Sequence, residues 1–268
     1  MEDRSHRRPI QNRKRPIWGR LLFFLVICLI LFLGVSVFFR VDEIRVAGET
    51  RYTAEQVIRA SGISQGDHLF LVNAESAARG IQRELPYIGQ VEIRRRFPNR
   101  LEITVNETIP MSALRLETGY LILDRDARIL ERTETTPLIR LIELYGLPEP
   151  ISPREGTALN LGEAEQDRLR YLRDILHVIA TLGLSSQIST LDMTELHNPE
   201  LFFDGRFTVR LGPNRNLRQK MDMLVGIIAT MSDYDAGLID LGPDQPVFRP
   251  NWPNQSERDY PEYGTEAS

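Results

Sequence analysis

The sequence has little of the chemistry that metal proteins and redox proteins depend on. Its 268 residues include a single cysteine and four histidines. Cys28 has no second thiol in the chain to pair with, so no intrachain disulfide can form and stability must come from packed cores. His6, His68, His177 and His197 lie far apart, and none has a partner at the i, i+4 spacing of a ligand pair. The sequence therefore predicts no metal site.

Sequence motifs of catalysis are lacking as well. There is no G-x-S-x-G, S-x-x-K or glycine-rich phosphate loop. Asp124-Arg125-Asp126 begins like a calcium loop but lacks the glycine and the final glutamate, so a hairpin turn is favoured. Numerous carboxylates leave a hydrolytic pair open, although most of them begin helices or alternate outward on strands. Arg94-Arg95-Arg96 has no interleaved aromatics and lies in an acidic region, which argues against nucleic acid. We predict a protein without a catalytic residue, cofactor or small-molecule substrate.

Charge is absent from one segment, Leu21 to Phe39, which consists almost entirely of Leu, Ile, Val and Phe. At about 1.5 Å per residue, a helix of this length spans roughly 28 Å, close to the ~30 Å apolar core of a bilayer. Residues 1–20 hold seven basic and two acidic side chains, which favours a cytoplasmic N-terminus. We predict a basic cytoplasmic tail at 1–20, a transmembrane helix at 21–39 and an external remainder. A cleaved signal peptide and a buried core helix are the alternatives.

Residues 40–110 are predicted to fold as a β-α-α-β-β unit, with two small helices on one side of a three-stranded sheet. The first strand is short, at Asp42–Val46. The helix signals are the capping box Thr53–Gln56 with a stop at Gly62, and an N-cap at Asn73 with a stop at Pro86.

In the hairpin that closes this unit, the alternation of apolar residues predicts how the two strands pair. Pairing Phe97 with Leu101 across the loop 98–100 places both apolar sets on one face. The same pairing sets Arg96 opposite Glu102 on the exposed face. Arg95 then points inward, and nothing in the sequence explains why.

Residues 111–250 are predicted to form a mixed, β-rich domain with two amphipathic helices, at Glu163–Leu182 and Asn216–Met231. Asp204-Gly205 is a strong hairpin signal between two of its strands. The predicted strands are Tyr120–Leu123, Arg128–Leu130, Leu138–Leu144, Ile188–Met193, Glu200–Phe203, Phe207–Leu211, Leu238–Leu241 and Val247–Arg249. The tail at 251–268 is polar and acidic and is predicted to be disordered.

In this order, behind one apolar run, the elements resemble the FtsQ/DivIB family of bacterial cell-division proteins along nearly the whole chain. Val41–Gly48 resembles the opening strand of that family's POTRA domain, and Val91–Ile103 resembles its hairpin with the Phe-Pro-Asn turn. The stretches that resemble the family's second, β-rich domain are Phe203-Asp204-Gly205, Val209-Arg210-Leu211-Gly212, Lys220 and Ile239-Asp240-Leu241.

The resemblance implies a non-enzymatic scaffold of the division septum that links early and late components of the division machinery. It further implies a single-pass type II protein of the cell membrane, with its C-terminus outside. The implied partners are small coiled-coil division proteins of the FtsB/DivIC and FtsL types, with septal peptidoglycan synthesis proteins as further partners. A membrane-anchored cell-wall enzyme and a POTRA-containing assembly or translocation factor are the alternative functions.

A partner can be recognised without catalytic chemistry when it adds a strand to a sheet edge. Gln245–Pro250 is the predicted edge, because proline is tolerated in sheets mainly at edges. We interpret Gln245, Val247, Phe248 and Arg249 as partner-binding residues. The two prolines of this stretch also limit the backbone bonds that a partner could gain, and the strand could instead only close the domain.

Overall fold

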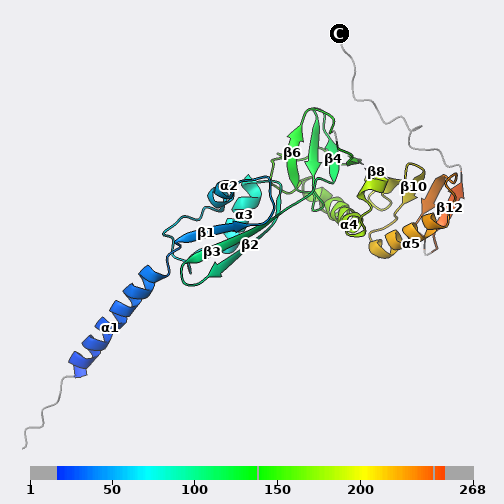
Figure 1. Ribbon diagram of the computed structural model, residues 1–268. Helices are drawn as coiled ribbons and strands as arrows, with labels where there is room; N and C mark the ends of the chain where they lie inside the picture. Colours follow the sequence, from blue (N-terminus) through cyan, green and yellow to red (C-terminus); the bar gives the residue numbers. More distant parts are fainter. Residues whose placement is uncertain (1–16, 138, 244, 251–268) are drawn as a thin grey trace, which may run out of the picture.

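The computed structural model describes residues 17–137, 139–243 and 245–250. The predicted basic tail up to residue 16 and the predicted disordered tail at 251–268 lie outside the described residues. Figure 1 shows an elongated chain in which a helix, a small α/β domain and a larger β-rich domain follow one another. This order of parts agrees with the predicted fold class for both domains.

The first helix, α1, runs from Ile17 to Phe38 and includes nearly all of the predicted span 21–39. Its side chains from Leu21 to Ile30 are exposed. Within the described part of the chain, no helix is both long and apolar enough to cross a membrane.

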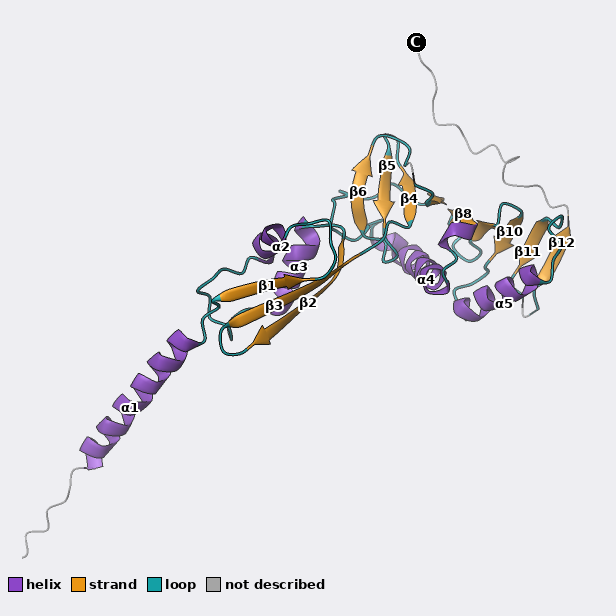
Figure 2. Ribbon diagram, viewed as in Figure 1, coloured by secondary structure: helices purple, strands orange, loops and turns teal. Residues whose placement is uncertain are grey.

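The small domain has the predicted order β-α-α-β-β. Its elements are β1 (Glu43–Ala47), α2 (Ala54–Ser61), α3 (Ala74–Glu84), β2 (Ile88–Arg96) and β3 (Arg100–Glu107). The sheet order is β1-β3-β2, with β1 parallel and β2 antiparallel to the central β3. Both helices lie on the same side of this sheet, as predicted (Figure 2).

Local sequence determines where these two helices begin and end. Thr53 accepts a hydrogen bond from the N–H of Gln56, whose side chain accepts one from the N–H of Thr53, so the predicted capping box is confirmed. Gly62 ends α2 in the left-handed conformation, with φ of 67°. Asn73 caps α3 through the N–H of Ser76. Both helices pack their apolar faces onto β3, whose Leu101, Ile103 and Val105 are fully buried.

The predicted hairpin register is wrong, because the pairing of the two strands is shifted by two residues. Ile93 pairs with Ile103 and Arg96 pairs with Arg100, so the turn is Phe97-Pro98-Asn99. Val91 and Ile93 still face the core, because the pairing differs by two residues in total and side chains alternate with a period of two. Phe97, predicted on the same face, lies in the turn and is 62 % exposed. Arg96 and Glu102 form the expected ion pair, 2.8 Å from Nε to Oε2, across a diagonal.

The large domain contains one mixed sheet of nine strands in the order β12-β11-β10-β9-β8-β7-β4-β5-β6. Its parallel pairs are β4 with β7, β7 with β8 and β10 with β11, and the other pairs are antiparallel. The strands are β4 (Ser112–Arg115), β5 (Tyr120–Leu123), β6 (Ile129–Thr133), β7 (Ile142–Tyr145), β8 (Ile188–Asp192), β9 (Glu200–Phe203), β10 (Phe207–Arg210), β11 (Gly237–Asp240) and β12 (Val247–Pro250).

One predicted strand is too long. Residue 138 of the strand predicted at Leu138–Leu144 lies outside the described residues, and among those described after it the strand begins only at Ile142, where it pairs with Ser112, the first residue of β4. A strand extends only as far as its neighbours can pair with it, and this limit is set by tertiary structure rather than by local composition.

Two helices, α4 (Gln166–Leu182) and α5 (Leu217–Ala229), lie along one side of the large sheet (Figure 2). A 3₁₀ turn at Glu163–Glu165 precedes α4, and Gly183 ends it with φ of 70°. The apolar residues that helical spacing places on one face of α4 are all buried, namely Leu169, Leu172, Leu176 and Ile179. On α5, the inward residues Leu217, Met221 and Leu224 are buried and Ile228 is partly buried, as the helical spacing predicted.

Candidate functional site

The predicted partner-binding strand lies at the end of the large sheet. β12 is the outermost strand and pairs antiparallel with β11 only, as the red end of the chain in Figure 1 shows. No strand of the described residues pairs with its outer side. The edge position that the prolines predicted is therefore confirmed, while partner binding there stays a prediction.

Proline determines which backbone groups of β12 face outward. Pro250 pairs with Gly237, and since Pro250 has no N–H, this pair cannot exchange two N–H···O bonds. Antiparallel pairs alternate between bonded and non-bonded types. The pairs of Arg249 with Leu238 and of Val247 with Asp240 are therefore the bonded ones. The N–H groups of Val247 and Arg249 therefore face β11.

The outer row of β12 consequently belongs to Phe248 and to the two prolines beside it. Pro246 and Pro250 contribute carbonyl acceptors only, so the N–H of Phe248 is the one donor that this short row offers a partner strand. In this register the N–H of Val247 faces β11, so Val247 can contact a partner only through its side chain. The signal was present in the sequence, because both prolines lie two residues from Phe248 and prolines turn their missing N–H toward the open side.

The side chains of the four predicted residues divide into two groups. Phe248 packs against the domain core, with its ring centroid 6.3 Å from that of Phe207. Gln245 and Arg249 are exposed, and Val247 is 40 % exposed. Val247 and Arg249 lie on the sheet face opposite to Phe248, since side chains alternate along a strand. These two present a small mixed apolar and cationic surface to a partner.

The loops under this edge are held by Lys220 of α5. Its ammonium donates to the carbonyls of Leu211, at 2.6 Å, and Pro213, at 3.0 Å. Burial lowers the pKa of Lys220, and the neighbouring charge of Arg215 lowers it further. Lys220 therefore joins the start of α5 to the segment after β10. It was one of the residues on which the family resemblance was based.

The segment that leads from β11 into β12 passes close to the segment after β10. At Gly212, φ is 67°, and an added Cβ would lie 2.5 Å from the Cα of Gly242. Only glycine combines this conformation with such a close approach. The segment that leads into β12 is thus packed closely against the segment after β10.

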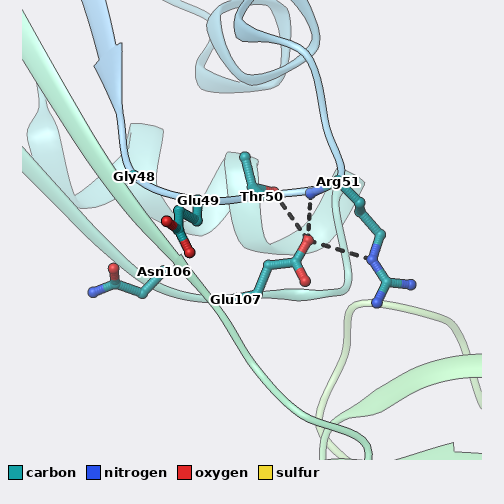
Figure 3. Close-up of a pocket in the computed structure, with 6 residues that line it drawn as sticks. All are labelled: Gly48, Glu49, Thr50, Arg51, Asn106 and Glu107. Atoms are coloured by element: carbon teal, nitrogen blue, oxygen red, sulfur yellow. Dashed lines mark hydrogen bonds and ion pairs between the residues drawn. The ribbon is translucent and has the colours of Figure 1, made fainter.

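A hollow lies in the small domain, where β1 leads into α2 next to the end of β3 (Figure 3). Its central carboxylate, Glu107, accepts hydrogen bonds from Thr50 Oγ1, at 3.3 Å, and from Arg51 N and Nε. The backbone bond from Arg51 is the main reason why the pKa of Glu107 is lowered. A carboxylate held ionised by its own loop is a poor proton donor. Glu107 therefore stabilises the loop that leads from β1 into α2.

Among the described residues, no group of three or more His, Cys, Asp or Glu lies close enough to hold a metal ion. Asp124, at the predicted turn, accepts from the N–H groups of Asp126 and Arg128, both at 2.9 Å. Asp124-Arg125-Asp126 is thus a hairpin turn between β5 and β6, as predicted.

The small domain matches a known family. Residues 39–108 match the family model described as "POTRA domain, FtsQ-type". These residues contain the β-α-α-β-β unit and begin directly after α1. The fold and this match define the class of protein, a POTRA-containing protein with a second, β-rich domain.

Similar proteins over longer stretches carry the names of cell-division proteins. The chain is 24 % identical over 243 residues to Cell division protein DivIB of Clostridium botulinum (strain Hall), covering 89 % of this chain and 93 % of that protein. It is 34 % identical over 194 residues to Cell division protein FtsQ of Anaeromyxobacter sp. (strain K), covering 72 % of this chain and 63 % of that protein. Cell division protein FtsQ of Corynebacterium glutamicum is 31 % identical over 128 residues, or 46 % of this chain and 56 % of that protein.

The chain belongs to the FtsQ/DivIB family of bacterial cell-division proteins. The resemblance drawn from the sequence is thereby confirmed, as is a role in cell division.

Proposed function

We propose that this chain is a non-enzymatic membrane scaffold of the division septum. It links early and late components of the division machinery by binding coiled-coil proteins of the FtsB/DivIC and FtsL types outside the cytoplasm. Residues 21–39 anchor it, with residues 1–20 in the cytoplasm and the C-terminus outside. The uncharged run and the basic residues before it support this topology.

The single observation that carries the binding proposal is the position of β12. It is a terminal strand with an exposed face and an outer backbone row, and a strand from a partner can pair with such a row. Because only Phe248 contributes a donor, the paired segment is short. The partner gains the rest of its affinity from side-chain contacts with Val247 and Arg249, and from packing its own helix beside these two side chains.

The test measures binding of the purified full chain to a coiled-coil partner pair of the FtsB/DivIC and FtsL types. Phe248 is replaced by N-methylphenylalanine through ligation of a synthetic C-terminal segment, which removes the outward donor and keeps the ring. We expect affinity to fall about tenfold, which corresponds to about 1.4 kcal/mol, with an unchanged urea midpoint. N-methylation of Val247 is the matched control, because its N–H faces β11, and it should lower the urea midpoint.

Side chains and tail are tested in the same assay. Arg249→Glu is expected to weaken binding without affecting unfolding, since Arg249 is exposed. Removing residues 253–268 is expected to leave binding intact. Binding that withstands both changes at β12 but disappears with the tail would move the site to residues 253–268.

A further inference from the structure

An aromatic cluster lies at the end of the small domain that adjoins α1. Phe39 follows α1 directly, Phe70 comes from the loop between α2 and α3, and Phe97 comes from the turn between β2 and β3. The ring centroids of Phe39 and Phe70 are 5.1 Å apart, those of Phe70 and Phe97 are 5.6 Å apart, and those of Phe39 and Phe97 are 6.1 Å apart. We call these three residues the aromatic tip.

The aromatic tip is not part of the domain core. Phe97 is 62 % exposed and Phe70 is 52 % exposed, and neither belongs to the buried cluster under α2 and α3. Leu71, beside Phe70, is 81 % exposed. Single exposed apolar residues are ordinary, but rings from three separate segments that pack on one another form a contiguous patch, and such patches mark binding surfaces.

Backbone hydrogen bonds fix the distance between this patch and the end of α1. The N–H of Leu69 donates to the carbonyl of Phe39, and the N–H of Val41 donates to the carbonyl of Asp67, both at 2.8 Å. On the other side, Asp42 N–H donates to Asn99 O at 2.8 Å. The chain leaving α1 is thereby attached to both loops of the tip, and α1 joins the domain at this end (Figure 1).

We propose that the aromatic tip inserts into the interfacial layer of the membrane beside the anchor and sets the angle at which the small domain stands on the bilayer. This inference rests on the anchor proposed above for residues 21–39. When α1 ends at the membrane surface, the loops bonded to residues 39–42 must lie at the same level. Apolar rings at that depth leave water for the boundary between headgroups and acyl chains.

A neutral lipid surface is the occupant that the charges favour. Three arginines near the tip are paired with glutamates, at 2.7 to 2.9 Å, in the pairs Arg94–Glu92, Arg96–Glu102 and Arg100–Glu43. Arg95 donates to the carbonyls of Leu69 and Val72, and Arg40 is exposed. Paired guanidinium groups have little net attraction for anionic headgroups. Insertion is therefore driven by the rings, and it should occur in vesicles of phosphatidylcholine alone.

The experiment uses the full chain in such vesicles, with both native tryptophans replaced (Trp18→Phe, Trp252→Phe) and one tryptophan introduced by Phe97→Trp. Lipids brominated near the headgroup end of the acyl chain are expected to quench this indole at least about twofold more strongly than lipids brominated at the chain end, as for a group about 5–10 Å deep. Tyr234→Trp is the matched control, because Tyr234 is 96 % exposed in the large domain. Its fluorescence should not respond to either lipid. Adding Phe70→Ser to the Phe97→Trp variant should reduce quenching and leave the urea midpoint unchanged.

Three results would overturn the inference. In the first, the chain sediments with the vesicles, but aqueous iodide quenches the indole at position 97 as strongly as the one at position 234. The anchor is then in the membrane and the tip is not. An indole shielded in native membranes and not in pure lipid indicates a partner protein instead of lipid. A chain that does not sediment at all contradicts the anchor itself, and the tip insertion with it.

Discussion

Arg128 of the large domain donates a hydrogen bond from Nη2 to the carbonyl of Pro86 in the small domain, at 2.8 Å. The same guanidinium reaches the carbonyls of Gln82 and Ile88, each at 3.1 Å. Three carbonyls at the end of α3 and the start of β2 thus share one cation from the turn between β5 and β6. This side chain joins the two domains.

Replacing Arg128 should loosen the domain junction. Arg128→Ala leaves three carbonyls without their donor, and we expect a loss of about 3 kcal/mol in the free energy of unfolding. Urea unfolding, measured by intrinsic fluorescence and circular dichroism, should then show two separate transitions. Arg125→Ala in the same turn is the control, because Arg125 is exposed, and it should change stability by about 0.5 kcal/mol or less. Equal effects of the two substitutions would contradict the junction role.

Tyr87 predicts a pH dependence at the same junction. Its hydroxyl donates to Glu131 Oε2 at 2.6 Å, and burial, reinforced by Glu131, raises the pKa of Tyr87 from 10.0 to about 12. Folding thus favours the protonated phenol. The resulting stability is fully present below pH 10.0 and is lost as the pH rises through about 12.

The test of this linkage compares urea midpoints at about pH 9 and about pH 11. Tyr87→Phe should reduce the alkaline loss of stability by about 1 kcal/mol, since the half-buried ring is screened by solvent. Tyr120→Phe is the control and should keep the alkaline loss of the unmodified chain. An identical pH dependence in all three proteins would reject the prediction.

Arg95, the inward arginine of the hairpin, holds the loop between α2 and α3. Its Nε donates to the carbonyl of Leu69 at 2.9 Å and its Nη2 to that of Val72 at 2.7 Å. Arg95→Met keeps much of the aliphatic stem but loses both bonds, so we expect a loss of about 1–3 kcal/mol and faster amide exchange in residues 66–72. Arg94→Met breaks only an exposed ion pair with Glu92 and should have a small effect. Unchanged exchange in Arg95→Met would show that the loop is held by other contacts.

The small domain should be sensitive to charge in its central strand. Ile103 is fully buried, and Ile103→Asp places a carboxylate without a partner in the core, so the domain should unfold. Its cross-strand neighbour Ile93 is only partly buried, and Ile93→Asp should cost less. Glu92→Lys, on the exposed face, should leave the melting temperature nearly unchanged. A folded Ile103→Asp variant in circular dichroism melts would contradict this description of the core.

Several features could be predicted from sequence because their causes are local. The capping box at Thr53, the N-cap at Asn73 and the stop at Gly62 each depend on residues within one turn of a helix. The buried stripe of α4 follows from apolar residues at helical spacing. Alternation likewise predicted which side chains of β2 and β3 face the core, even though their pairing register was wrong.

Other features depend on contacts between segments that are distant in the chain, and no local pattern encodes these. The inward direction of Arg95 follows from alternation, but its partners, the carbonyls of Leu69 and Val72, lie more than twenty residues away. The start of β7 at Ile142 is set by where β4 begins.

The sequence by itself determined the order of elements in the small domain, the caps of its helices and the family, because helical periodicity and turn chemistry are properties of neighbouring residues. It also placed the prolines that mark β12 as an edge. The tertiary structure decided which strand β12 pairs with and which of these pairs are hydrogen-bonded, and it thereby established that Phe248, rather than Val247, directs its N–H outward. It likewise brought Phe39, Phe70 and Phe97 together from three segments, since ring contact requires the folded positions of both loops.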